Sequence, residues 1–260
     1  MIPVSCPVCG TAATLAENET YRACGQCQAE IYRPAPGPRV LVAHETVELR
    51  HALGETLCTA GYHVLAAASG GQVLELVRAH GPKAVVLDVG LTGMTTFQIL
   101  EHLKAPSAPP IKAVLVASVF NKTAYKRRPT KLYGADDYLE QHHIRDMLAQ
   151  KVGALVGFTP TVGAPTAPTL PDAGGAVRPD LRGKLRVRAL AHSIVSDIAL
   201  YHQGEFEAIV QGGDPTALSA ALQEGRRLLD EMIGADAKTS QDPVGEAFRA
   251  FIDEMRKAGT

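Results

Sequence analysis

The stretch Ala84-Val-Val-Leu-Asp88-Val-Gly-Leu-Thr-Gly-Met94 joins a short apolar run to an acidic residue and a loop with two glycines. Such a run, bounded by turn-forming residues, is typical of a buried β-strand. Similar runs occupy 40–43, 62–66 and 111–117, and segments with helical apolar spacing lie between them, at 47–60, 71–80 and 97–104. The alternation predicts an α/β fold with a doubly wound parallel sheet covered by helices on both faces.

Polar side chains follow the predicted strands at the points where these strands end. His44 and Glu45 follow the first run, Asp88 ends the third, and Ser118 follows the fourth. Ligands of open parallel sheets bind beyond the carboxyl ends of the strands, near the point where the strand order reverses. We therefore expect a functional site at this edge of the sheet.

The stretches 85–94 and 134–139 resemble the receiver domain of response regulators. The resemblance covers about 39–155, within a domain expected at 39–157. It implies a flavodoxin-like fold with a five-stranded sheet and Asp88 as the phosphoacceptor. It also implies Mg²⁺ held by Glu45 and Asp88. Ser118 and Tyr138 are the expected switch residues, and a histidine kinase is an expected partner.

The chain departs from this family's pattern at three positions. His44-Glu45 stands where the family has two acids, Gln141-His142 stands where it has Lys-Pro, and the switch residue aligns with Ala117 or, by a one-residue slip, with Ser118. An aspartyl phosphate forms readily only where a divalent cation and a lysine neutralise the transferred group. Two interpretations remain open, a phosphorylatable but atypical receiver and a pseudo-receiver that binds proteins. We expect His44 to be a surface residue near the site.

Four of the five cysteines form two C-x-x-C pairs, and 14 residues lie between Cys9 and Cys24. Two such pairs are typical of a closed, structural Zn²⁺ site, in which no coordination position remains for a water or substrate. A redox pair would need a single C-x-x-C in a thioredoxin-like context, which the sequence lacks. The segment 1–33 resembles a zinc ribbon, with a strand expected at 30–32. The ligands are Cys6, Cys9, Cys24 and Cys27.

A basic segment lies between the fourth and fifth predicted strands. It holds five cations and no acid, and Pro129 interrupts any helix there. One interpretation is a solvated loop, and the other is a docking site for an acidic or phosphate-bearing partner, because arginine pairs well with carboxylate and phosphate. The cations are Lys122, Lys126, Arg127, Arg128 and Lys131.

Proline- and glycine-rich stretches at 34–38 and 158–179 indicate linkers. The segment 180–260 has the apolar spacing of three helices, at 181–202, 215–233 and 243–258. It resembles a helical module found with zinc ribbons and receivers in gliding and fruiting delta-proteobacteria, and these helices could form a homodimer. No helix-turn-helix pattern is present, so nucleic-acid binding is unlikely on sequence grounds.

Composition and charge narrow the functional classes. Lys plus Arg total 26 and Asp plus Glu total 27, so no overall charge attracts nucleic acid or an anionic membrane. No stretch resembles a signal peptide or a membrane span, and we expect a cytoplasmic protein. Without a phosphate-binding glycine loop, a catalytic triad or an open metal site, we predict no enzyme. The favoured hypothesis is an adaptor for signalling or motility proteins, and the alternative is a regulator with DNA-binding output.

Overall fold

The computed structural model describes residues 1–260 except 107, 118–128, 130–131, 162–180, 234–241 and 259–260. Contacts between residues divide the chain into two compact units. One unit comprises Met1–Ala117 with Tyr133–Leu170, and the other comprises Ser118–Leu132 with Pro171–Thr260.

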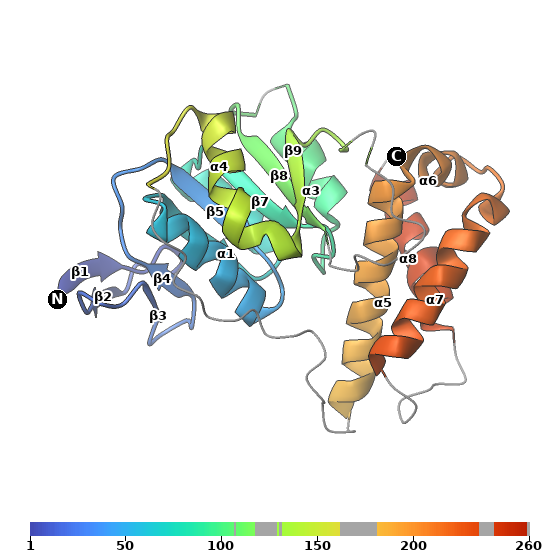
Figure 1. Cartoon of the computed structure of the whole chain (residues 1–260), viewed down its shortest axis with the longest axis horizontal. Helices are drawn as coiled ribbons and strands as arrows, with labels where there is room; N and C mark the ends of the chain where they lie inside the picture. Colours follow the sequence, from blue (N-terminus) through green and yellow to red (C-terminus); the bar gives the residue numbers. More distant parts are fainter. Residues whose placement is uncertain (107, 118–128, 130–131, 162–180, 234–241, 259–260) are drawn as a thin grey trace. The chain divides into compact units, whose positions relative to one another are not determined.

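The larger unit contains the predicted parallel sheet (Figure 1). Its strands are β5 (Arg39–Ala43), β6 (His63–Ala67), β7 (Ala84–Asp88), β8 (Lys112–Ala117) and β9 (Asp137–Glu140), in the order β6-β5-β7-β8-β9. All four neighbouring pairs are parallel. This order is the flavodoxin-like one, with the reversal between β5 and β7, and it confirms the predicted fold class.

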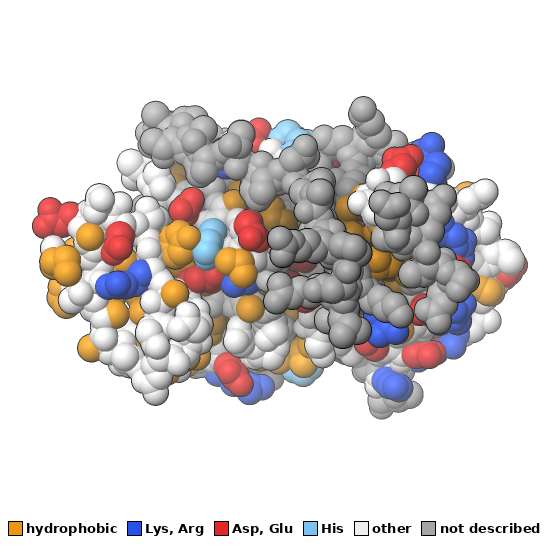
Figure 2. Space-filling model, turned by 90° about the horizontal axis from the view of Figure 1, so that it is seen from below, with side chains coloured by type: hydrophobic (Ala, Val, Ile, Leu, Met, Phe, Trp, Pro, Cys, Tyr) orange, Lys and Arg blue, Asp and Glu red, His pale blue; other side chains and the backbone are white. Residues whose placement is uncertain are grey.

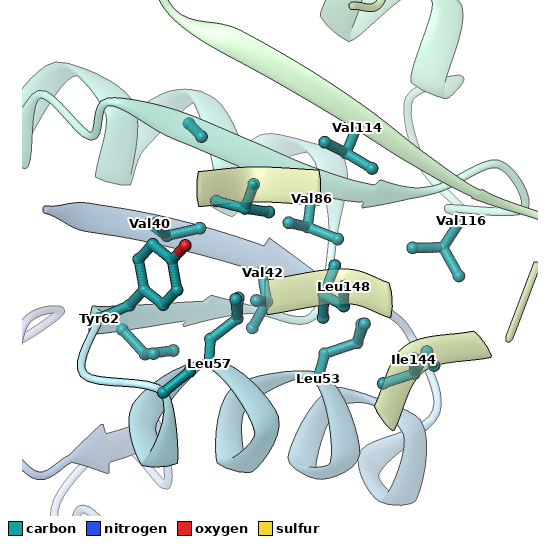
Figure 3. Packing of buried hydrophobic residues seen from close by; sticks show 14 of the residues in the cluster. Val40, Val42, Leu53, Leu57, Tyr62, Val86, Val114, Val116, Ile144 and Leu148 are labelled. Atoms are coloured by element: carbon teal, nitrogen blue, oxygen red, sulfur yellow. The ribbon is translucent and has the colours of Figure 1, made fainter. Parts of the chain in front are cut away.

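Helices cover both faces of this sheet. On one face, α1 (Val47–Thr59) and α4 (Ile144–Val156) enclose alternate strand residues such as Val42 and Val86 (Figure 3). The other helices are α2 (Gly70–His80) and α3 (Thr96–Leu103), whose apolar sides are also buried. Because both faces are covered, successive strand residues are fully buried, which explains the continuous apolar runs of the sequence.

The amino-terminal segment folds as two antiparallel hairpins. They pair β1 (Ile2–Ser5) with β2 (Ala12–Leu15) and β3 (Tyr21–Ala23) with β4 (Glu30–Tyr32). Their shared apolar cluster contains little beyond Val4, Leu15, Ile31 and two cysteines. Such a small core cannot stabilise a fold of this size by burial alone, so it needs another source of free energy.

The two-hairpin segment packs against α1. Tyr32 from β4 is buried within the same apolar cluster as Leu53 and Leu57. Gly54 permits this approach, because a Cβ atom there would lie 2.2 Å from the Tyr32 ring. The remaining thiol, Cys58, also faces this junction and donates to the carbonyl of Arg33, and burial raises its pKa.

The smaller unit is helical in its described part. It contains α5 (Leu181–Tyr201), α6 (Gln203–Val210), α7 (Ser219–Ile233) and α8 (Pro243–Ala258). The prediction of three helices missed α6, whose two buried apolar residues are too few to produce a periodic signal. The predicted helix 215–233 is a short 3₁₀ turn, Pro215–Leu218, followed by α7.

The described surface carries few large apolar side chains. On the face that Figure 2 shows, the described hydrophobic side chains are scattered among polar ones. Few large apolar side chains are exposed among the described residues, and Met1, Val8, Val47 and Met147 are those few. None of the described helices combines the length and the apolar character that a membrane span requires.

Candidate functional site

The four paired cysteines meet at the tips of the two hairpins. One ligand sulfur from each of Cys6, Cys9, Cys24 and Cys27 lies within 4.8 Å of the others. The Sγ atoms are 3.5 Å apart for Cys6 and Cys27 and 3.6 Å apart for Cys9 and Cys24. Zn–S bonds of about 2.3 Å in a tetrahedron place sulfurs about 3.8 Å apart, so the geometry fits a Zn²⁺ ion. These four residues would complete the coordination shell of the ion, and the ion would cross-link the two hairpins.

The two cysteine turns have the same backbone design. In the first turn, the amide of Cys6 donates to the carbonyl of Thr11, and the amide of Gly10 donates to the carbonyl of Cys6. In the second turn, the amide of Cys24 donates to the carbonyl of Ala29, and the amide of Gln28 donates to the carbonyl of Cys24. Gly10 and Gln28 occupy corresponding positions, and both have positive φ, 75° and 61°.

The four clustered thiols affect one another's ionisation, and their pKa values move in opposite directions. A hydrogen bond with the Thr11 side chain lowers the pKa of the Cys9 thiol to about 6. A hydrogen bond with the Ala29 amide favours the Cys27 thiolate, but burial and the neighbouring sulfurs outweigh it and raise the pKa of Cys27 to about 12. Crowded thiols cannot all ionise beside one another, whereas a bound divalent cation stabilises all four thiolates.

A second site lies at the carboxyl ends of the sheet strands. Asp88 ends β7, and His44 and Gln141 directly follow β5 and β9. His44 Nε2 is 3.8 Å from Asp88 Oδ1 and 3.3 Å from the Gln141 side-chain nitrogen. His44 is 4% exposed and Asp88 is 3% exposed. The expectation that His44 is a surface residue is therefore wrong, because its ring fills the space between three strand ends.

Hydrogen bonds determine how this histidine is oriented. The amide of Thr46 donates to His44 Nδ1 over 3.0 Å. The other ring nitrogen, Nε2, faces both Asp88 Oδ1 and the side-chain amide of Gln141. Asp88 Oδ1 has no hydrogen-bond partner among the described residues. The hydroxyl of Thr96 donates to the backbone carbonyl of Asp88 and holds the following loop against the strand end.

The other predicted site residues are distributed differently. Glu45 is exposed, and its backbone carbonyl is held by Arg50. Tyr138 is half-buried in β9, where it lies opposite Leu115. Ser118 and all five cations of the basic segment lie outside the described residues: Lys122, Lys126, Arg127, Arg128 and Lys131.

A buried ion pair that the sequence does not predict joins the hairpins to α1. The Arg50 guanidinium lies 2.7 Å from the carboxylate of Glu30, and His51 Nε2 lies 2.9 Å from that same carboxylate. Glu30 is in a three-residue strand in which every residue is buried. No local pattern distinguishes it from a solvent-facing acid, since its partner is 20 positions away.

Comparison with known proteins supports the α/β part of this architecture. The family model for the response regulator receiver domain matches residues 40–152. Residues 40–152 form a response regulator receiver domain. The carboxyl-end cluster around Asp88, hereafter the receiver site, lies in this domain.

Relatives of known sequence extend this likeness. The response regulator MprA of Mycobacterium sp. (strain KMS) is 26% identical over 220 residues, covering 84% of this chain and 87% of MprA. The transcriptional regulatory protein KdpE of Mycobacterium tuberculosis (strain H37Rv) is 30% identical over 117 residues, covering 45% of this chain and 50% of KdpE.

Solved structures also resemble the receiver domain. The chemotaxis response regulator CheY4 of Vibrio cholerae is 21% identical, with a TM-score of 0.38, and the match covers 45% of this chain and 98% of CheY4. The receiver domain of Francisella response regulator 1452 is 21% identical, with a TM-score of 0.39, and covers 46% of this chain and 98% of that domain.

The residues of this receiver site fit Mg²⁺ poorly. Mg²⁺ demands octahedral oxygen ligands, usually one or two carboxylates with waters. Asp88 offers one unpaired carboxylate oxygen, but the imidazole of His44 faces it. Glu45 is exposed, and Gln141, which directly follows β9, carries no charge. These residues therefore do not provide the charge neutralisation that phosphoryl transfer needs.

Proposed function

We propose that this protein is a signalling adaptor whose receiver domain is a pseudo-receiver, a protein-binding module rather than an efficient phosphoacceptor. The observation that carries this proposal is the burial of His44 against Asp88. A histidine in this place excludes the second acid of a magnesium site and covers the carboxylate that a phosphodonor would have to reach. Gln141 cannot supply the positive charge of a lysine.

Binding by this adaptor would involve the basic segment. Five cations and no acid between residues 121 and 133 favour a partner with acidic or phosphate-bearing groups. Cytoplasmic signalling or motility proteins, a histidine kinase among them, belong to this class of partner. Reversing the charges of Arg127 and Arg128 should abolish co-purification of the partner, and undiminished recovery would contradict this docking surface.

Intact-mass analysis with Mg²⁺ and a small-molecule phosphodonor tests the pseudo-receiver directly. We expect no phosphoryl adduct on the native chain under conditions that label an ordinary receiver. The double variant His44→Asp/Gln141→Lys restores an acid and the lysine, and it should acquire an adduct.

The controls for this experiment locate the label. Adding Asp88→Ala to the double variant should remove the adduct, because the acyl phosphate needs that carboxylate. An adduct on the native chain that disappears in Asp88→Ala would overturn the pseudo-receiver and would establish a phosphorylatable receiver that uses Glu45 and Asp88 for Mg²⁺.

A regulator with DNA-binding output is the second candidate. The match to MprA spans 84% of this chain and therefore extends beyond the receiver domain. This candidate predicts sequence-selective DNA binding by the full chain, with an affinity that falls steeply as salt concentration rises. The balanced charge of the chain and its lack of a helix-turn-helix pattern favour the adaptor.

A further inference from the structure

Arg50 joins the metal-binding hairpins to the receiver site. Its Nε donates to both carboxylate oxygens of Glu30, over 2.9 and 2.7 Å. Its Nη1 donates to the backbone carbonyls of His44 and Glu45, over 2.6 and 3.1 Å. Arg50 is 7% exposed and Glu30 is 8% exposed, so water competes little for these bonds. One buried guanidinium thus holds a hairpin acid and the loop that carries His44.

The position of Glu30 depends on the second cysteine turn. Glu30 directly follows Ala29, whose carbonyl accepts the amide of Cys24 over 2.8 Å. The hairpins have only a small apolar core, so this turn needs a bound ion to keep its shape. When the turn opens, Glu30 loses its defined position beside Arg50.

The receiver end of this connection reaches Asp88. Arg50 holds the carbonyl of His44, while the ring of the same residue faces Asp88. The amide of Thr46 reinforces this arrangement by donating to the ring. A shift of the Arg50 guanidinium therefore changes how the imidazole covers Asp88.

We propose that the cysteine site is a metal-responsive input for the receiver domain, and that Arg50 transmits its occupancy to the loop beside Asp88. The inference rests on Zn²⁺ binding by the four cysteines and goes beyond the proposed adaptor function. Zn²⁺ binding stabilises the state in which His44 covers Asp88. Because coupling between two sites is reciprocal, that state in turn increases the affinity for Zn²⁺.

Hydrogen exchange of the full chain, with Zn²⁺ bound or removed by a chelator, tests this connection. Removing Zn²⁺ should increase exchange at residues 44–50, with the largest effect at the Thr46 amide. In the double variant Glu30→Leu/Arg50→Met the increase should be lost. Exchanging both members of a buried ion pair for apolar groups is often neutral for stability, so this variant should still fold and bind Zn²⁺.

His80→Ala provides a matched control. His80 Nε2 lies 2.8 Å from the carbonyl of Pro7 in the first cysteine turn, so it ties the hairpins to α2 without touching Arg50. We expect this variant to keep the zinc-dependent change at residues 44–50. The proposal would be overturned if the chain bound no Zn²⁺. It would also be overturned if hydrogen exchange at residues 44–50 of the native chain were the same with and without Zn²⁺.

The reciprocal measurement is the Zn²⁺ dissociation constant, obtained by chelator competition. His44→Ala should weaken Zn²⁺ binding at least about fivefold in the native background. The same substitution should have no effect in the Glu30→Leu/Arg50→Met background. Equal weakening in both backgrounds would contradict transmission through Arg50. Neither readout involves phosphorylation, so a failure here is distinct from a failure of the pseudo-receiver.

Discussion

At the residue scale, the functional features of this protein depend on buried polar side chains with specific partners. Glu30 and Arg50 form a bonded pair that bridges two structural elements. His44 and Asp88 face one another at the receiver site without a hydrogen bond between them. Burying a charged group is costly unless a partner compensates it, so each of these side chains constrains its neighbour.

Arg50→Met should destabilise the protein strongly, because it leaves the Glu30 carboxylate buried without its guanidinium. We expect a loss of about 3–5 kcal/mol in the free energy of unfolding, measured in urea. The double variant Glu30→Leu/Arg50→Met should recover most of that loss. Lys151→Met, which breaks a partly exposed pair with Asp137, should cost at most about 1 kcal/mol. A similar loss for both single variants would contradict this account.

Asp136 should contribute to stability in a pH-dependent way. Burial alone would raise its pKa, but hydrogen bonds from Lys104, Lys112 and the Ala113 amide outweigh burial and hold the pKa below its ordinary value of 3.8. Its stabilising contribution is therefore present above that value and is lost as the pH falls through the lower, folded-state pKa.

The variant Asp136→Asn tests this dependence. It should be less stable than the native chain at pH 7, and the difference in the free energy of unfolding should shrink as the pH falls below about 4. Urea unfolding at a series of pH values measures the difference. A difference that stays constant down to pH 2 would show that the ionised carboxylate is not responsible.

At the element scale, the two cysteine turns and α1 determine how the two-hairpin segment meets the receiver domain. The turns share one hydrogen-bond pattern, but only the first has glycine at the position with positive φ. On α1, Gly54 leaves room for the Tyr32 ring. A substitution at position 28 tests the positive φ of the second turn, and a substitution at position 54 tests the close approach of Tyr32.

Gln28→Gly should stabilise the second cysteine turn. Left-handed backbone costs an ordinary residue about 1 kcal/mol more than glycine, and Gln28 has φ of 61°. We expect tighter Zn²⁺ binding in chelator competition. Gly10→Ala should do the opposite, because it imposes the same strain on the first turn. Weaker Zn²⁺ binding by Gln28→Gly would contradict the correspondence of the two turns.

Gly54→Ala should separate Tyr32 from α1. The added Cβ would lie 2.2 Å from the tyrosine ring, so the ring or the helix must move, at a cost of about 1–3 kcal/mol. Gly71→Ala is the matched control, because its Cβ would meet nothing within 4 Å on α2. That variant should gain up to about 1 kcal/mol from helix propensity. Thermal unfolding of both variants measures the contrast.

At the scale of the whole molecule, the chain consists of two units with separate cores. The two-hairpin segment belongs to the unit that contains the receiver domain, because Tyr32 is part of that domain's core. The helical unit has its own buried residues, including Ile194, Phe206 and Phe251. Zn²⁺ should consequently affect the stability of one unit and not the other.

Zn²⁺ removal should therefore lower only one of two thermal transitions. Elemental analysis should find one Zn²⁺ per native chain, and Cys24→Ser should reduce this content. Calorimetry of the chelated protein should show a lower Tm for the receiver unit and an unchanged transition for the helical unit. A common shift of both transitions would indicate that the two units unfold together.

The receiver-like sheet can be read from the amino-acid sequence alone, because buried parallel strands need continuous apolar runs. The cysteine cluster can also be read there, because paired C-x-x-C spacing serves tetrahedral metal binding. The sequence also locates Asp88 at a strand end. The burial of His44 beside Asp88 and the pairing of Arg50 with Glu30 become visible only in the folded chain. These contacts join residues distant in the chain, and a local pattern cannot report a partner that only folding brings within hydrogen-bonding distance.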